Sequence, residues 1–358
     1  MNKGLLLSVF GLGYTAFCHA DIPQNYGQLE LKLNTRYWND QGVAHPTLLN
    51  PNPTTSRYEQ SALGMELNYR SVYWHDWLGI DGSVYAVSKL FDTGKPTAQL
   101  LEVENNGKLA QNFAVLGQLY VKAKLGEGSE IKIGRQLQDS LLLKSTNTRA
   151  VPDTFSGVSA QFKLNPELNT YLSYYDRWKP RSMDSFEKLV TDNNEHIPYV
   201  ALMGAKYQTQ QWTLNTEYLK SKDYLEKYGT TIQYKLPFAS STWLLTGGAF
   251  FSRDDGNLFK CAAEADLDCI KGQQISNRGN GYFFDINWMI KRFELGAAIS
   301  KFDGFWIEDN FSTHSDRIGG LTQDHGTNPF PTSSAIGPDF TNNDETAVAL
   351  RLDITGRM

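Results

Sequence analysis

The sequence predicts an all-β fold, a transmembrane antiparallel β-barrel, and three observations support this prediction. Segment after segment alternates apolar and polar residues with the period of two that a strand with one apolar face requires. The connections between these segments run alternately long and short, which is typical of barrels with short turns at one membrane face and long loops at the other. A mean hydropathy of -0.43 argues against a bundle of membrane-spanning helices.

The first twenty residues have the layout of a secretory signal peptide. Lys3 precedes the apolar run GLLLSVFGLGYTAF, and the small residues Cys18 and Ala20 lie three and one positions before a cleavage point at Asp21. A buried first helix is the alternative, which the polar DIPQNYGQ that follows disfavours. We therefore expect residues 1–20 to be a signal peptide and residues 21–358 to form the barrel of an exported protein.

The mature chain contains fourteen strand-like segments. The first shows the pattern: Leu29, Leu31 and Leu33 alternate with polar residues. In chain order the expected strands cover about residues 27–38, 60–70, 77–88, 114–125, 129–135, 155–164, 167–177, 197–207, 211–221, 228–236, 241–252, 280–290, 292–301 and 345–355. Alternation also occurs in soluble β-sandwiches, so it does not by itself choose between the two architectures.

The connections favour the barrel. Short ones read GEGS, NPE, QTQ, LPFAS and KR, whereas residues 39–59, 252–280 and 303–344 form long ones. Several tryptophans lie beside the short turns, where an aromatic girdle would meet one membrane interface: Trp74, Trp77, Trp212, Trp243 and Trp288. Core tryptophans in a secreted sandwich are the alternative.

The cysteines and the charge exclude several kinds of site. Beyond the signal peptide, Cys261 and Cys269 are separated by seven residues in the acidic segment CAAEADLDC, which contains no His. A disulfide in an oxidising compartment therefore fits better than a metal site, with two free thiols as the alternative. The net charge of -5 gives no reason to expect nucleic acid. We expect neither a metal nor a cofactor.

One long connection, GRQLQDSLLLKSTNTRAVPDTFSG, shows no alternation. It joins the fifth and sixth strands and is therefore the third long loop. Its SLLLK run would form an exposed apolar patch in water. We expect residues 136–153 to fold into the barrel, with Leu141–Leu143 buried and Lys144, Asn147 and Arg149 facing the passage; a loop that caps the barrel from outside is the alternative.

This region resembles the constriction loop of the OprD family of substrate-specific outer-membrane porins. The matching residues are Gly134, Leu142, Asn147, Arg149, Pro152, Thr154, Phe155 and Gly157. The segments GIDGSVYAVSKL and FDGFWIEDNFS also resemble the family, and the similarity spans most of residues 26–355. The resemblance implies a channel in the bacterial outer membrane that passes small water-soluble solutes, often carboxylates, along basic side chains. It also implies eighteen strands, four more than the fourteen expected here, so this chain, which ends at DITGRM, is expected to be truncated; a shorter closed barrel with an unusual end is the alternative.

The resemblance makes Arg149 a basic group of the constriction. A guanidinium pairs with a carboxylate through two parallel hydrogen bonds, which suits this role. We expect Lys144, Asn147 and Arg135 to contribute to the same constriction. Strand residues on the predicted inner face extend the basic row: Lys32, Arg36, Arg70, Lys122 and Arg351, opposed by Asp81, Asp285 and Asp353. The alternative is that these charges keep the channel wet and pair with neighbours.

We therefore expect a channel for passive diffusion of small solutes, with carboxylate-bearing nutrients as the favoured class. One alternative is a sugar-specific porin that uses Tyr85, Tyr120 and Phe283 as a sliding surface. Another is a non-conducting structural or adhesive barrel, suggested by the long loop 303–344. The chain has no catalytic motif, so we do not expect an enzyme. The expected partners are solutes, outer-membrane lipid and the barrel assembly machinery, and the expected state is a monomer or a loose trimer.

Overall fold

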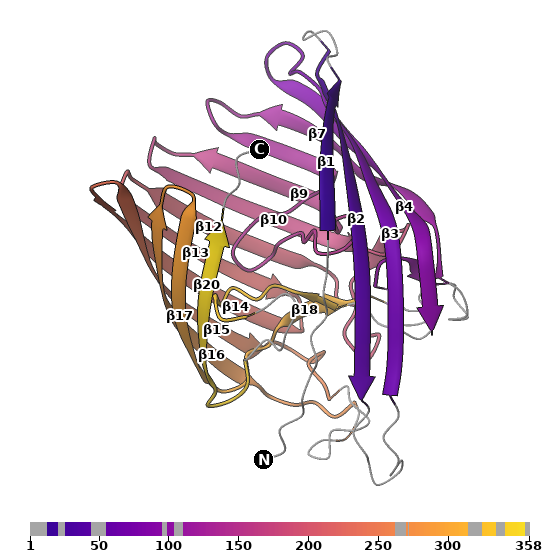
Figure 1. Cartoon of the computed structure of the whole chain (residues 1–358). Helices are drawn as coiled ribbons and strands as arrows, with labels where there is room; N and C mark the ends of the chain where they lie inside the picture. The colour runs from indigo at the N-terminus through magenta and orange to yellow at the C-terminus, as the bar shows by residue number, and fades with distance from the viewer. Residues whose placement is uncertain are drawn as a thin grey trace.

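The computed structural model describes residues 13–20, 26–43, 55–94, 99–103, 110–261, 270, 272–313, 324–333 and 341–354. Its main element is one curved antiparallel sheet (Figure 1). The long strands are β2 (Gln28–Val43), β3 (Thr55–Arg70), β4 (Leu78–Gly94), β7 (Phe113–Lys124), β8 (Glu130–Gln136), β9 (Thr154–Lys163), β10 (Leu168–Lys179), β12 (Val200–Gln208), β13 (Trp212–Ser221), β14 (Leu225–Phe238), β15 (Ser241–Asp254), β16 (Arg278–Ile290), β17 (Phe293–Asp303) and β20 (Thr346–Ile354). Each pairs with its neighbour in this order, and each of the fourteen predicted strands overlaps one of them. The all-β prediction is confirmed.

The remaining strands are short or terminal. β1 (Gly13–Ala20) pairs with β2, and β11 (Glu187–Lys188) adds to β10. Two small hairpins stand apart from the sheet: β5 (Glu102–Val103) with β6 (Ala110–Gln111), and β18 (Asp309–Ser312) with β19 (Asp324–Gly326). β1 lies within the predicted signal peptide, which stays a prediction. β1 and β20 end the sheet order, and within the described residues they do not pair with each other.

No helix long and apolar enough to cross a membrane occurs in the described part of the chain.

The two faces of the sheet differ in chemistry. One face exposes large apolar side chains, among them Leu119, Ile133, Met203, Phe284 and Leu350. The other face carries polar groups that are buried by the loops, among them Asn34, Glu66, Asp81, Lys122 and Glu217. Since successive side chains of a strand point to opposite faces, the predicted alternation separates an apolar outer wall from a polar inner one.

The buried apolar residues lie where loops pack on the inner face. One cluster joins Leu142 and Leu143 of the third long loop to Phe155 at the start of β9, Trp178 of β10 and Phe311 of β18. A second cluster joins Ala150 and Val151 of the same loop to strands β3, β4 and β7. Figure 1 shows β18 on the concave side of the sheet. The loops therefore supply the core that the strands alone do not have.

Candidate functional site

The third long loop, residues 137–153, has its own internal scaffold. The amide of Ser145 donates to the carbonyl of Gln138 at 2.7 Å. Asp153 accepts hydrogen bonds from the Thr146 amide at 2.5 Å and from the indole of Trp178 at 2.8 Å. These bonds close the loop on itself and tie its far end to β10.

Glu217 of β13 anchors the first half of the loop. Its two carboxylate oxygens accept the amides of Leu141 and Leu142, each at 2.7 Å. The hydroxyl of Tyr171, from β10, donates to the same carboxylate at 2.5 Å. Because hydrogen bonds to ionised groups are the stronger class, this one side chain holds the loop backbone against the wall. Leu142 and Leu143 are fully buried as a result.

Strands β2 and β3 anchor the second half. The side-chain amide of Asn34 donates to the carbonyls of Arg149 and Ala150 at 3.2 and 3.4 Å. Gly64 of β3 lies directly beneath the loop, where a Cβ atom would come within 2.0 Å of the Ala150 oxygen. Only glycine at this position allows the loop backbone so close to the sheet.

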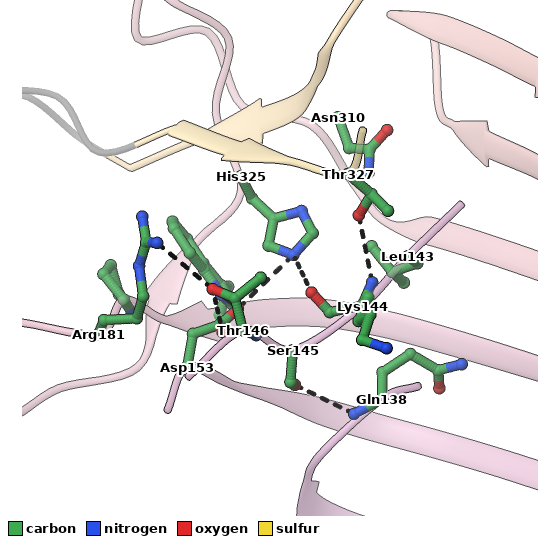
Figure 2. A network of polar contacts seen from close by, with 12 residues as sticks. Gln138, Leu143, Lys144, Ser145, Thr146, Asp153, Arg181, Asn310, His325 and Thr327 are labelled. Carbon is green, nitrogen blue, oxygen red and sulfur yellow. Dashed lines mark hydrogen bonds and ion pairs between the residues drawn. The ribbon is translucent and has the colours of Figure 1, made fainter. Parts of the chain in front are cut away.

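The last long loop locks the third loop from the other side (Figure 2). The Nε2 atom of His325, in β19, lies 3.2 Å from the Lys144 carbonyl and 3.5 Å from Asp153. Asn310 of β18 donates to the Leu142 carbonyl at 3.0 Å, and the Lys144 amide donates to the Thr327 hydroxyl at 3.2 Å. Burial lowers the pKa of His325, so its ring is neutral at neutral pH.

Three arginines converge on the second half of the loop. Arg181 and Arg149 both donate to the hydroxyl of Thr148, at 2.7 and 3.3 Å, and Arg36 donates to the Asn147 carbonyl at 3.1 Å. Within the described residues, no carboxylate forms an ion pair with any of these three guanidinium groups. We call Arg36, Arg149 and Arg181 the arginine cluster.

The guanidinium of Arg149 is held by contacts on several sides. Its guanidinium lies 3.9 Å from the centre of the Trp38 ring and donates to the side-chain oxygen of Gln99 at 2.8 Å. Burial, together with the cations of Arg181 and Arg36, lowers the pKa of Arg149 to about 9. The group is still charged at neutral pH, so this face of the loop carries a concentrated positive charge.

Two polar cavities lie along the inner wall beside the loop. One, of about 190 Å³, is lined by Lys32, Arg70, Lys132, Glu66 and Asp81. The other, of about 680 Å³, is lined largely by amide and hydroxyl side chains and reaches Lys206. Lys132, Gln136 and Leu137 line both cavities, so the two are adjacent. A water-soluble solute would meet hydrogen-bonding groups throughout this space.

Comparison with known proteins decides the family. A family model described as outer membrane porin, OprD family, matches residues 27–355. The chain belongs to the OprD family. It is therefore an outer-membrane channel for small solutes, located in the bacterial outer membrane. No curated protein sequence matches it significantly.

Solved structures show the same fold as this OprD-family porin. Pseudomonas aeruginosa OpdK, determined with vanillate, has a TM-score of 0.70 and 19% identity over 91% of this chain and 77% of its own. Pseudomonas aeruginosa OccK8 (OprE) has a TM-score of 0.71 and 17% identity, over 92% and 79%. A BenF-like porin from Pseudomonas fluorescens Pf-5 has a TM-score of 0.70 and 19% identity, over 92% and 78%.

Four of the eight predicted basic residues of this porin are paired with carboxylates. Lys122 bonds Asp81 at 2.7 Å, and Lys144 bonds Asp139 at 2.8 Å. Lys32 lies 3.5 Å from Glu30, and Arg351 pairs with Asp285. Arg70 lines the smaller cavity, and the side chain of Asn147 is exposed at the loop tip. Of the predicted basic row, only Arg36 joins Arg149 in the arginine cluster.

Arg135 is not brought to the constriction. It is opposite Leu119 and Ser156 in the sheet, and Leu119 belongs to the exposed apolar face. In β8 the inward positions are Lys132, Gly134 and Gln136, so the odd-numbered Arg135 points to the outer wall. Its guanidinium stacks on Phe186 at 4.4 Å from the ring centre. We expected Arg135 to contribute to the constriction, but it lies in β8, one residue before the predicted loop 136–153.

Other predicted residues have mixed outcomes. Cys261 is disulfide-bonded, and its predicted partner Cys269 lies outside the described residues. Tyr85 is fully buried, so its ring offers no sliding surface for sugars, whereas Tyr120 donates to Asp81 at 2.9 Å, is half-buried and lines the smaller cavity. Phe283 packs partly buried against the larger core cluster.

Sequence reasoning missed four residues of the site. Lys132 follows the inward alternation of its strand and could have been found from that period. Glu217 also follows the inward alternation, but nothing in its own strand shows that its partner is a loop about 75 residues away. Arg181 lies in the turn after β10 and His325 in the three-residue strand β19, and neither has a periodic signal, so only the folded chain shows where their side chains lie.

Proposed function

We propose that this porin passes small carboxylate-bearing solutes and that the arginine cluster attracts them to the constriction. The observation that carries the proposal is the convergence of Arg36, Arg149 and Arg181 around Asn147 and Thr148 with no carboxylate paired to them in the described residues. Unpaired guanidinium groups are suited to bidentate carboxylate recognition, and their charge raises the local anion concentration. The vanillate in the similar OpdK structure, a carboxylate, supports the same class of solute.

The two cavities offer a path beyond the cluster. Lys32, Arg70 and Lys132 line the smaller cavity, and Lys132 and Lys206 line the larger one together with Glu130 and Asp139. Glu66 and Asp81 lie among these cations, which keeps the binding of an anion weak enough for release. We therefore expect the arginine cluster to select the solute. In the cavities, hydrogen bonds from amide and hydroxyl side chains would replace the water molecules bound to the solute.

Single-channel recording with the full chain refolded in detergent tests this function. We expect anion-selective current in a planar bilayer under a salt gradient, with block by benzoate. Arg149→Gln or Arg181→Gln should weaken that block about tenfold, because one charge-assisted hydrogen bond contributes about 1.5 kcal/mol.

Arg135→Gln is the matched control, since it removes a guanidinium from the outer wall only. It should leave selectivity and block unchanged. A wild type that conducts cations and anions equally, or variants whose block equals that of the wild type, would contradict the proposal.

A further inference from the structure

A basic cleft lies on the outer wall of the sheet, away from the passage. Arg135 of β8, Ser156 of β9 and Arg177 of β10 stand side by side in the ladder, each opposite the next. With Phe186 they line a cleft of about 440 Å³. Neighbouring strands are about 4.8 Å apart, so both long arginine side chains reach a group placed over the Ser156 hydroxyl.

The charged side chains that line this cleft are mainly positive. Lys188 of β11 is opposite Arg177 and exposed, which adds a third cation on the same face. Asp184 also lines the cleft and offsets part of this charge. Glu187 is opposite Trp178, and its carboxylate accepts a hydrogen bond at 2.8 Å from the hydroxyl of Ser185, which lines the cleft. Among the residues that line the cleft, the two guanidinium groups of Arg135 and Arg177 outweigh the single carboxylate of Asp184, which leaves a net attraction for an anion.

The cleft lies at the depth of the lipid headgroups. β8 runs from a short turn to the third long loop, and Arg135 is its penultimate residue. Long loops face the outside of the cell in these barrels, so the cleft is at the outer leaflet. The next outward-facing row toward the membrane consists of Ile133, Val158 and Tyr174, which are opposite one another in the sheet. The ring of Tyr174 packs on that of Tyr199, with 4.9 Å between the ring centres. Interfacial aromatic belts mark the boundary between hydrocarbon and headgroups.

We infer that this cleft binds a phosphate group of a phosphorylated glycolipid of the outer leaflet, of the lipid A type. Arg135 and Arg177 donate to the phosphate oxygens, and the Ser156 hydroxyl lies between them. Below the phosphate, the acyl chains run along the exposed apolar strip that contains Val121 and Ile133. Basic pockets at membrane interfaces recognise anionic headgroups in this way, with hydrophobic contact below and charge above.

The test measures lipid binding to the full chain in detergent by native mass spectrometry. The probes are phosphorylated lipid A, the same lipid with its phosphates removed, phosphatidylglycerol and inorganic phosphate. We expect the wild type to prefer phosphorylated over dephosphorylated lipid A by about thirtyfold, and the double variant Arg135→Gln/Arg177→Gln to lose that preference. Lys163→Gln, at the short-turn end, should keep it.

Three outcomes would overturn the inference: equal binding of the dephosphorylated lipid, a preference that survives in the double variant, or phosphatidylglycerol bound as tightly as lipid A. Saturation of the cleft by inorganic phosphate alone at the same concentration would also overturn it, since the ligand would then be a free phosphate ion and not a lipid headgroup. Unchanged single-channel conductance of the double variant shows that it is folded. Arg135→Lys/Arg177→Lys should retain part of the preference, because lysine keeps the charge without the fork geometry.

Discussion

Single side chains hold the third long loop in its position. Glu217 is the clearest case, because one carboxylate accepts two consecutive loop amides and a tyrosine hydroxyl. At the other end of the loop, the side-chain amide of Asn34 donates to two consecutive carbonyls. These residues contact no part of the arginine cluster's guanidinium groups, yet they determine where those groups lie.

Glu217→Ala should therefore release the first half of the loop. Two buried amides lose charged acceptors, which should lower the free energy of unfolding by about 3 kcal/mol and make the open current noisier. Urea unfolding in detergent and single-channel noise are the measurements. Tyr171→Phe removes one bond to the same carboxylate and should cost about 1 kcal/mol. Equal effects of the two variants would show that the loop does not depend on this carboxylate.

The ring of His325 makes the lock between the two loops sensitive to acid. Burial lowers its pKa below the ordinary value of about 6.5, with Arg181 acting in the same direction and Asp153 against it. The unfolded chain therefore binds this proton more readily than the folded one. The stability contributed by the neutral ring is full at neutral pH and is lost as the pH falls below about 6.5.

The expected result is a lower melting temperature of the wild type at pH 5 than at pH 7. His325→Gln keeps a donor near the Lys144 carbonyl and removes the titrating group, so its pH dependence should be smaller. Circular dichroism melts at both pH values measure the difference. The same pH dependence in both proteins would assign the acid sensitivity to other groups.

At the scale of elements, strand β3 shapes the loop through a missing side chain. A Cβ atom on Gly64 would come within 2.0 Å of the Ala150 carbonyl, whereas one on Gly247 of β15 would find its nearest neighbour at 3.8 Å. Gly64→Ala should push the loop away from the sheet. This would also move Arg149, which precedes Ala150 and whose carbonyl accepts a hydrogen bond from Asn34. Gly247→Ala should be neutral.

Reversal potentials under a salt gradient measure this effect. We expect Gly64→Ala to lower the anion preference several-fold, close to the effect of Arg149→Gln, because the guanidinium leaves its position against Trp38. An unchanged preference in Gly64→Ala would mean that the loop accommodates the methyl group without moving the arginine cluster.

The hairpin of β18 and β19 is a second element that shapes the passage. It comes from the last long loop and reaches residues about 170 positions earlier in the chain through Asn310. Its hydrogen bonds to the third loop go to the backbone carbonyls of Leu142 and Lys144, and His325 also lies 3.5 Å from the carboxylate of Asp153. The inner surface of the channel is therefore built by two loops together.

At the scale of the whole molecule, charge is divided between paired and unpaired groups. Lys122 and Arg351 are neutralised by strand carboxylates, whereas the arginine cluster has no such partner in the described residues. Exposed charges are screened within about 10 Å at 0.1 M salt and about 3 Å at 1 M. The anion preference should accordingly fall as the salt concentration rises.

Permeability ratios measured from about 0.1 M to about 1 M salt test this expectation. The wild type should lose most of its anion preference over that range, and the double variant Arg149→Gln/Arg181→Gln should change little. A preference that is independent of salt would place the selective charges in a fully desolvated site.

The sequence by itself determined the strands and the class of fold, and it predicted a constriction at the third loop. Side-chain alternation and loop length are local properties, and they predicted all fourteen long strands because a strand's two faces are encoded by adjacent residues. The loop motif likewise pointed to Arg149 without knowledge of its surroundings.

Only the tertiary structure decided which charges act together. Arg36, Arg149 and Arg181 come from a strand and two irregular segments, and no local pattern links them. The alternation also ends where a strand meets a loop, so the direction of Arg135 depended on the register of β8 with its neighbours. Pairings such as Glu217 with the loop amides form across about 75 residues, where contact is set by the packing of the whole sheet.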